Sequence, residues 1–233
     1  MRKLACILPA VAALFALSSP VTAQTKYRFE VFGAGNFPFS KNFEITTPQS
    51  TVPLYGKHEF SAGARGGVRL GGDFMKNWGQ DILYSYGTNA SRIINQSTGG
   101  EFPVNNQIHQ LCINALWYPG GHGAKKRVMP FVTAGVGAAF YRISQSVINE
   151  ALDPARGGLG KLRNENVLQF NAGGGVAFRV NEVWGFRIDV RDNMSRPIRY
   201  GLPKESGDPR ATVFPVGGIF HQLEIAFAFV YYF

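Results

Sequence analysis

The sequence predicts an all-β protein, an eight-stranded antiparallel up-and-down transmembrane β-barrel that follows a cleavable export signal. Three observations support this fold class. Residues 219–233 alternate between an apolar and a mixed set of side chains, the connections between the expected strands alternate between long and short, and a short apolar run follows two basic residues at the N-terminus.

Residues 219–233 carry the clearest strand pattern of the chain. The apolar members of the alternation are Leu223, Ile225, Phe227, Phe229, Tyr231 and Phe233. Successive side chains of a β-strand point to opposite faces, so these residues share one surface, whereas a helix would scatter them around its circumference. Taken alone, the stretch also fits the last strand of a soluble β-sandwich, so the barrel prediction depends on the rest of the chain.

Seven earlier stretches show strand-like alternation. They are residues 27–34, 60–70, 81–86, 110–117, 129–143, 168–179 and 184–191. The long connections, rich in Pro, Gly, Asn and Thr, are residues 36–57, 89–106, 144–164 and 196–218, and the short ones lie near 71–73, 119–127 and 181–183. This asymmetry is typical of bacterial barrels, with four long extracellular loops and tight periplasmic turns, and an even strand number places both termini in the periplasm. The glycines of 129–143 leave the facing of that strand undecided.

The N-terminus has the order of a secretory signal peptide. Arg2 and Lys3 precede an apolar run, Leu4–Leu17, that is too short to span a bilayer comfortably as a helix. Small residues end at Ala23, after which we expect cleavage. The sequence therefore divides into a signal peptide, 1–23, and an outer-membrane β-barrel domain, 24–233. No later stretch has the uninterrupted apolar length of a transmembrane helix.

Charge and cysteine content restrict the partners. Cleavage removes Arg2 and Lys3 from the 24 basic residues, leaving 22 against 15 acidic ones and a net charge of +7. An exported protein has little access to nucleic acid, so we expect no nucleic-acid partner and consider anionic lipopolysaccharide and the surrounding outer-membrane lipid instead. Cys112 is the one cysteine of the mature chain, so no internal disulfide and no cysteine-based metal site is expected.

The tryptophans and charges indicate which face meets lipid. A soluble eight-stranded barrel would bury the apolar stripes, and alternation alone does not exclude that arrangement. However, Trp78, Trp117 and Trp184 come from three different hairpins and all fall at the short-turn end, as expected for a membrane-interface girdle. The charged residues oppose the apolar stripes, and an arginine exposed to lipid at the midplane would cost about 2–4 kcal/mol. We therefore expect the charges inside.

An eight-stranded barrel is just wide enough for side chains to fill its interior. The charged residues on the expected inner faces are Arg28, Glu30, Arg65, Arg69, Asp81, Arg179, Arg187, Asp189, Arg191 and Glu224. We expect a lumen ion-pair network built mainly from Arg65, Arg69, Arg187, Asp189, Arg191 and Glu224. Such a filled lumen would leave no wide pore.

The stretch Phe186-Arg-Ile-Asp-Val-Arg191, together with residues 219–233, resembles the eight-stranded outer-membrane β-barrel family that includes the transmembrane domain of outer-membrane protein A. The resemblance covers Tyr27–Phe233. It implies that Phe229, Tyr231 and Phe233 act as the assembly signal read by the barrel-assembly machinery. Larger members of the family carry a peptidoglycan-binding domain after the barrel; because this sequence ends at Phe233, that activity is not expected.

No arrangement of residues predicts catalysis, a cofactor or a metal site. The enzymatic alternative is an outer-membrane lipid A deacylase, a family that places His and Ser close together on one strand; here Ser195 has no His two positions earlier, and His58, His109, His122 and His221 have no Ser at that spacing. Gly173–Gly175 lacks the Lys-Ser/Thr of a phosphate loop. We therefore expect a monomer with a structural or surface-interaction role through its long loops. In the last loop, Arg196, Arg199, Lys204 and Arg210 could reach lipopolysaccharide phosphates.

Overall fold

The structure is a computed structural model that describes residues 26–45, 54–95, 100–123, 125–152, 162–205 and 213–233. The expected signal peptide, 1–23, lies outside these residues. The strands are β1 (Lys26–Pro38), β2 (Lys41–Ile45), β3 (Leu54–Phe60), β4 (Gly63–Met75), β5 (Trp78–Asn95), β6 (Gly100–Trp117), β7 (Val128–Ile143), β8 (Glu165–Arg179), β9 (Trp184–Ser195) and β10 (Phe220–Tyr232). One helix, α2 (Gln145–Leu152), follows β7. None of the described helices is long and apolar enough to cross a membrane.

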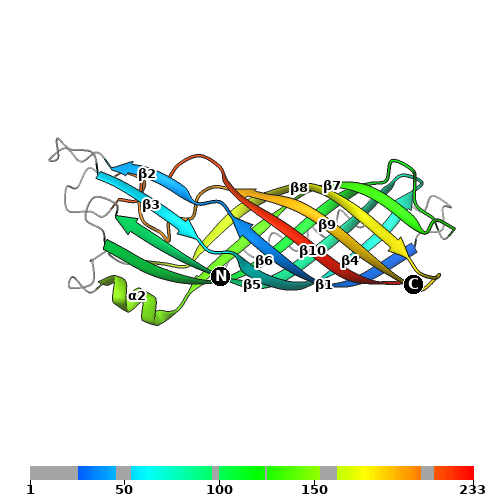
Figure 1. The fold of residues 1–233 in the computed structure, drawn as a ribbon, viewed down its shortest axis with the longest axis horizontal. Coiled ribbons are helices and arrows are strands. Elements are labelled where there is room, and N and C mark those ends of the chain that lie inside the picture. The colour runs from blue at the N-terminus through cyan, green and yellow to red at the C-terminus, as the bar shows by residue number, and fades with distance from the viewer. Residues whose placement is uncertain (1–25, 46–53, 96–99, 124, 153–161, 206–212) are drawn as a thin grey trace, which may run out of the picture.

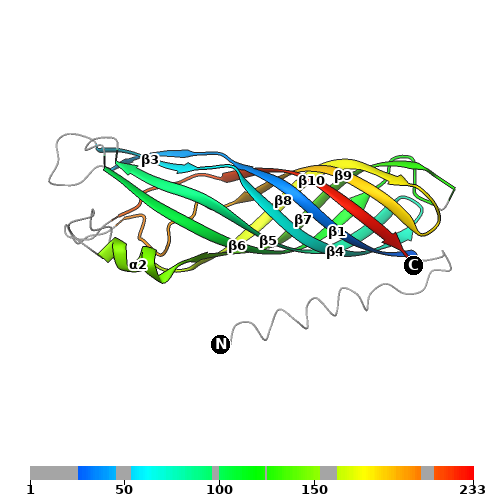
Figure 2. The same cartoon turned by 60° about the horizontal axis from the view of Figure 1, so that its bottom comes forward.

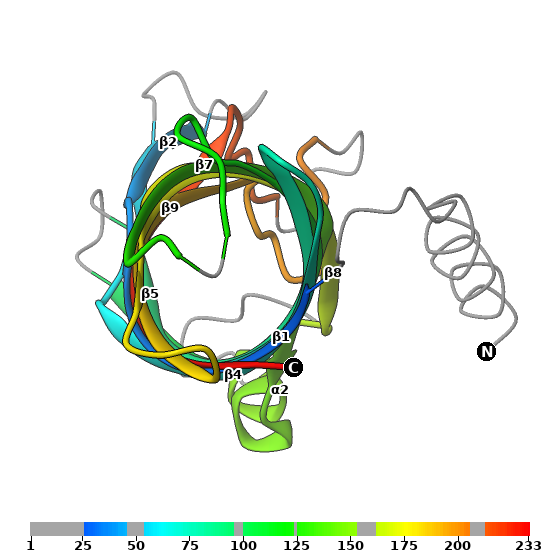
Figure 3. The same cartoon turned by 90° about the vertical axis from the view of Figure 1, so that its right-hand side faces the viewer.

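Eight antiparallel strands close into a barrel, which confirms the predicted fold class. The order β5-β4-β1-β10-β9-β8-β7-β6 is completed by pairing of β5 with β6, and a view along the barrel shows the closed ring (Figure 3). The first and last strands meet, because Tyr27 and Phe233 exchange backbone hydrogen bonds of 3.1 and 3.0 Å. Closure leaves no unpaired strand edge within the ring, which is the condition for a β-structure to cross a bilayer.

Alternation along each strand sorts the side chains into an apolar outer face and a largely polar inner face. On β10, Ile225, Phe227 and Phe229 are exposed, while Glu224 and Ala226 are buried. On β7, whose facing the sequence left undecided, Met129, Phe131 and Tyr141 point inward and Val132 and Val136 outward. The outer side chains form an apolar belt: Tyr27, Phe29, Val31, Val68, Leu70, Tyr84, Leu111, Val132, Val136, Leu168, Phe170, Phe186, Ile188, Val190, Ile225, Phe227 and Phe229.

Two of the expected long loops are wrong. Residues 89–95 and 100–106 continue β5 and β6, which are 18 residues long each, and residues 36–57 contain β2 and the start of β3, with β3 paired to β5. A tilted strand needs only about 9–11 residues to cross a bilayer, so β5 and β6 project beyond the apolar belt. We call β2, β3, residues 88–95 and residues 100–107 the wall extension (left in Figure 1). The prediction failed because the outward positions of these strands face water and are polar, which gives the strands the composition of a loop.

Phe60 was also placed on the wrong face. The sequence predicted one strand over 60–70 with Phe60 and Val68 on the same surface, but β3 ends at Phe60 and β4 begins at Gly63. Phe60 is buried inside, whereas Val68 is exposed outside. The break at residues 61–62 changes the phase of the alternation.

The wall extension encloses a second, apolar core. Its buried residues include Phe43, Phe60, Ile93, Phe102, Val104, Tyr141, Val147, Ile198, Tyr200, Leu202, Phe214, Val216 and Phe220. Several of them come from the connection between β9 and β10, whose described residues, 196–205 and 213–219, we call the plug segment. Part of this segment, in orange, turns inward within the outline of the ring (Figure 3). The last predicted loop therefore lies partly inside the barrel rather than outside it.

The short connections all lie at the opposite end. They join β4 to β5, β6 to β7 and β8 to β9, and the described residues nearest the N-terminus lie at this end together with Phe233 (right in Figure 2). We call it the short-turn end.

Candidate functional site

The centre of the lumen is organised around Asp189, on β9. Its carboxylate accepts two hydrogen bonds from Arg69, of 2.9 and 3.1 Å, and one of 3.0 Å from Nε of Arg191. Nε of Arg187 lies 3.2 Å from the same carboxylate. All four side chains are at least 98 % buried, so one carboxylate interacts with three guanidinium groups away from water.

A second carboxylate links this group to the short-turn end. Glu30, on β1, accepts hydrogen bonds from Arg28 (3.0 Å), Arg69 (3.1 Å) and Arg187 (3.0 Å). Arg187 also reaches Asp81 at 3.2 Å. Strands β1, β4, β5 and β9 thus contribute to one continuous network.

Nearer the wall extension, the lumen contains one ion pair together with several amide side chains. Arg65 bonds Glu224 at 3.0 Å and also bonds Gln110. Gln110 and Gln169 both donate to Oδ1 of Asn193, at 3.2 and 2.7 Å. These residues cross-link β4, β6, β8, β9 and β10 through the lumen.

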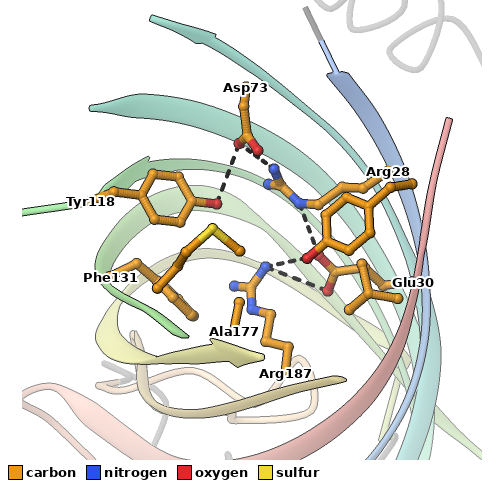
Figure 4. Close-up of a pocket in the computed structure, with 10 residues that line it drawn as sticks. Arg28, Glu30, Asp73, Tyr118, Phe131, Ala177 and Arg187 are labelled. Carbon is orange, nitrogen blue, oxygen red and sulfur yellow. Dashed lines mark hydrogen bonds and ion pairs between the residues drawn. The ribbon is translucent and has the colours of Figure 1, made fainter. Parts of the chain in front are cut away.

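Asp73 and Tyr118 extend the network to the short-turn end (Figure 4). Arg28 bonds Asp73, and the Tyr118 hydroxyl donates to Asp73 at 3.3 Å. Beside them lies a cavity of about 10 Å³, lined also by Glu30 and Arg187. This is about the space that one water molecule requires.

Burying so many charges is favourable only where partners compensate the loss of hydration. Aromatic rings supply part of the compensation: Arg69 lies 4.2 Å from the Phe32 ring centre, Arg187 4.2 Å from that of Phe131, and Arg179 3.8 Å from that of Tyr232. Among the described residues, Arg179 has no carboxylate partner. The structure thus brings Arg65, Arg69, Arg187, Asp189, Arg191 and Glu224 into the lumen and sets Arg179 apart from the ion pairs.

Tyr200 attaches the plug segment to the barrel wall. Its hydroxyl lies 3.2 Å from Oγ of Ser91 and accepts a hydrogen bond of 2.9 Å from Asn106. Oε2 of Glu165 accepts hydrogen bonds from the backbone N–H groups of Arg199 and Tyr200, both at 2.6 Å. Tyr200 has a positive φ of 53°, a conformation that costs a non-glycine residue free energy and persists where its surroundings hold it.

His58 lies in the same apolar core. Its ring centre is 4.1 Å from that of Phe60 and 5.3 Å from that of Phe214, and its Nε2 has no hydrogen-bond partner among the described residues. Burial lowers the pKa of His58 to about 3, because the apolar surroundings disfavour the charged imidazolium.

The two edges of the apolar belt carry amphipathic side chains. At the short-turn end, Trp78 and Trp117 are cross-strand partners, and Trp184 packs against Phe229 and Tyr231 with ring centres 4.9 and 4.8 Å apart. These tryptophans are 41–45 % exposed, on the outside of the barrel.

The edge beside the wall extension, which we call the upper rim, has polar pairs instead. Tyr84 bonds His109 at 2.9 Å, Asp192 lies 2.7 Å from His221, and Arg142 donates to Asn166 at 2.8 Å.

Ser195, the serine weighed for the enzymatic alternative, does not point toward His221 on the neighbouring strand. Ser195 faces the inside of the wall and donates to the Arg196 carbonyl, whereas His221, one strand away, faces outward. Within the described residues there is also no group of three or more His, Cys, Asp or Glu side chains able to hold a metal ion.

Sequence reasoning missed Asp73, Tyr118 and the plug residues Ile198, Tyr200 and Leu202. Asp73 was assigned to a turn, because Gly71-Gly72-Asp73 has turn composition, but it lies within β4. The alternation of Ile198, Tyr200 and Leu202 was a usable signal, hidden by the flanking prolines.

Comparison with solved structures supports the fold. OprG from Pseudomonas aeruginosa is 15 % identical, with 89 % of this chain and 95 % of that chain covered and a TM-score of 0.54. Neisserial surface protein A is 8 % identical over 91 % of this chain and 98 % of its own, with a TM-score of 0.45. No family model and no curated protein matches the chain. At this identity the likeness extends to the fold, and the chain has the eight-stranded β-barrel fold of the outer-membrane protein OprG.

Proposed function

We propose that the chain is a small closed barrel of the bacterial outer membrane that acts through its outer surface rather than through its lumen. The observation that carries the proposal is that the lumen is filled at two successive levels. The ion-pair network occupies the barrel inside the apolar belt, and the apolar core with the plug segment occupies the wall extension. No wide pore is expected through two such layers.

The apolar belt supports a membrane location. On β5 it runs from Trp78 to Tyr86, which matches the about 9–11 residues of a tilted membrane strand. Beyond it the outer face becomes charged: Arg92 lies 2.8 Å from Glu59 and 3.3 Å from Glu101. A lipid-facing surface followed by a water-facing one is the arrangement that a bilayer boundary requires.

The wall extension is the part that would meet other molecules. We place it outside the cell and both termini in the periplasm, because long segments of such barrels are extracellular and tight turns periplasmic. The surface role belongs to the wall extension and the remaining connections, with outer-membrane lipid and lipopolysaccharide as neighbours. We further propose that the protein is a monomer and that the assembly machinery recognises β10.

Impermeant maleimide labelling of intact cells tests this orientation. Glu101→Cys places a thiol on the wall extension, where the glutamate side chain is 51 % exposed, and Lys125→Cys places one at the short-turn end; the native Cys112 is only 1 % exposed. The proposal predicts labelling of the first variant in intact cells and of the second only after lysis. Labelling of Lys125→Cys in intact cells, with Glu101→Cys protected, would contradict it.

The alternative function is lipid A deacylation. One observation favours this alternative. His221 and Asp192 form a pair 2.7 Å apart on the outer face of the upper rim, where they would meet lipid headgroups. Mass spectrometry of lipid A from cells with and without the protein distinguishes the two. An unchanged acyl pattern is expected. Loss of an acyl chain that requires both the protein and His221 would establish the enzyme instead.

A further inference from the structure

We propose that Arg142 and Arg196 form a binding site for a phosphate group of an outer-leaflet glycolipid, at the upper rim between β7, β8 and β9. The inference rests on the proposed membrane location and adds a specific ligand class and two residues to it. The two guanidinium groups come from distant parts of the sequence and meet at one residue, Asn166.

Arg142 occupies the last outward position of β7. Its Nη1 donates to Oδ1 of Asn166 at 2.8 Å and to the Tyr141 carbonyl at 3.1 Å. Its guanidinium carbon lies 5.6 Å from the centre of the Phe140 ring. An arginine of this kind keeps its aliphatic stem along apolar surface and its charged group at the polar boundary.

Within the described residues, Arg142 has no carboxylate partner, and its hydrogen bonds are made by Nη1 alone. In this part of the chain, Nε and Nη2 are the nitrogen atoms that an anionic ligand would engage.

Arg196 reaches the same point from the end of β9. Its Nη2 donates to the backbone carbonyl of Asn166 at 3.3 Å and lies 3.1 Å from Oε1 of Glu165. The other oxygen of Glu165, Oε2, accepts hydrogen bonds from the backbone N–H groups of Arg199 and Tyr200 in the plug segment. The Arg196 side chain is 52 % exposed. It is therefore positioned by the protein yet open to an external ligand.

The surroundings favour a phosphorylated lipid over a soluble anion. Leu168 and Phe170, on the same strand as Asn166 and toward the short-turn end, are 60 % and 53 % exposed. They offer an apolar surface to acyl chains two and four residues along β8 from Asn166, the residue that both guanidinium groups contact. Arg163 and Arg199 belong to the same end of the barrel, and together with Arg142 and Arg196 they outnumber the carboxylates of Glu150, Glu165 and Asp192 there.

Guanidinium groups suit phosphate because their planar N–H donors match its oxygens. A phosphomonoester, which carries about −1.5 to −2 charge at pH 7, would engage both arginines, whereas a zwitterionic headgroup has less net charge to offer. The proposed occupant is therefore a phosphorylated lipid A headgroup.

The test measures lipid retained by the full mature chain, purified in detergent and analysed by native mass spectrometry. The probes are bisphosphorylated lipid A and the same lipid treated to remove its phosphates. The wild-type protein is expected to retain the phosphorylated form at least about tenfold more strongly, a ratio equivalent to about 1.4 kcal/mol. Arg142→Gln combined with Arg196→Gln should remove most of this preference.

Arg92→Gln is the matched control, because Arg92 is equally exposed but lies in the wall extension and is paired with two glutamates. It should retain lipid as the wild type does. Equal retention of phosphorylated and dephosphorylated lipid A by the wild-type protein would overturn the inference even if the double variant does not fold. So would unchanged retention by a folded double variant, or a stronger preference for phosphatidylglycerol.

Failure of this inference is distinguishable from failure of the proposed function. The retention assay uses purified protein and does not depend on where the protein lies in the cell, whereas the maleimide experiment does not depend on Arg142 or Arg196. A correctly oriented barrel without phosphate preference would refute only the lipid site.

Discussion

At the residue scale, Asp189 is one of two lumen carboxylates that each interact with three arginines. It interacts with Arg69, Arg187 and Arg191, each at 3.2 Å or less. Removing one member of a buried ionic group leaves its partners without compensation, which is far more destabilising than losing an exposed pair. The buried ion-pair network is therefore stable only when all of its members are present.

Asp189→Asn should lower the stability of the folded barrel by about 3–5 kcal/mol, because the amide keeps the shape of the carboxylate but leaves three guanidinium groups underpaired. Urea unfolding of the detergent-solubilised protein measures this effect. Glu59→Gln is the control: Glu59 pairs with Lys57 and Arg92 at the surface, and exposed pairs contribute about 0–1 kcal/mol. Equal unfolding midpoints for the two variants would contradict the proposed role of the network.

Because His58 is buried, we expect the stability of the wall extension to depend on pH. Its folded-state pKa is about 3, below the unfolded value of about 6.5, so the unfolded state binds a proton first as pH falls. The stability associated with neutral His58 is complete above about pH 6.5 and decreases toward pH 3. At pH 4.5 the free energy of unfolding should be about 2–3 kcal/mol lower than at neutral pH.

His58→Phe, which fits the aromatic surroundings, should remove this part of the pH dependence. Thermal unfolding of wild type and variant at pH 7.5 and 4.5 provides the comparison. A wild-type protein that loses no more stability than His58→Phe on acidification would show that His58 is not buried in its neutral form.

At the element scale, β10 closes the barrel. It pairs with β9 on one side and β1 on the other, and the Phe233 ring stacks on Tyr27 and Tyr231 with centres 5.9 Å apart in both pairs. Loss of this strand's end would expose unpaired backbone groups at the lipid boundary.

Deleting Phe233 should reduce the amount of assembled barrel severalfold, because it removes the last pair of hydrogen bonds between β1 and β10 and the aromatic end that resembles an assembly signal. Heat-modifiable gel migration of membrane fractions quantifies folded protein. Phe39→Ser is a suitable control, since Phe39 is 55 % exposed and lies next to the wall extension. If both variants assemble equally well, the terminal aromatic has no special role.

The strands that cross the apolar belt could be predicted from sequence, whereas the wall extension could not. In Ile225–Phe229 every outward residue is apolar, as expected for side chains that face lipid. In residues 88–95 and 100–107 the outward positions include Arg92, Glu101 and Gln107, so a strand in water has the composition of a loop. The same holds for the site. Arg69 and Asp189 were predictable from alternation, but Tyr200 is positioned by tertiary contacts with Ser91 and Asn106.

At the scale of the whole molecule, the described side chains occupy the inside of the barrel in three successive layers. Ion pairs lie within the apolar belt, amide side chains lie next to them, and the apolar core with the plug segment lies in the wall extension. Each layer is held by cross-links between strands far apart in sequence. A solute would have to displace a charged network and then an apolar core, so we expect the outer surface to carry the function.

Planar-bilayer conductance tests this claim most directly. Purified mature protein, shown to be folded by heat-modifiable migration and inserted by protease protection, should produce no stable single-channel steps at neutral pH. Because folding and insertion are verified on the same preparation, silence would reflect a closed lumen. Large, steady steps from the verified wild-type protein would contradict the account and establish a porin-like function.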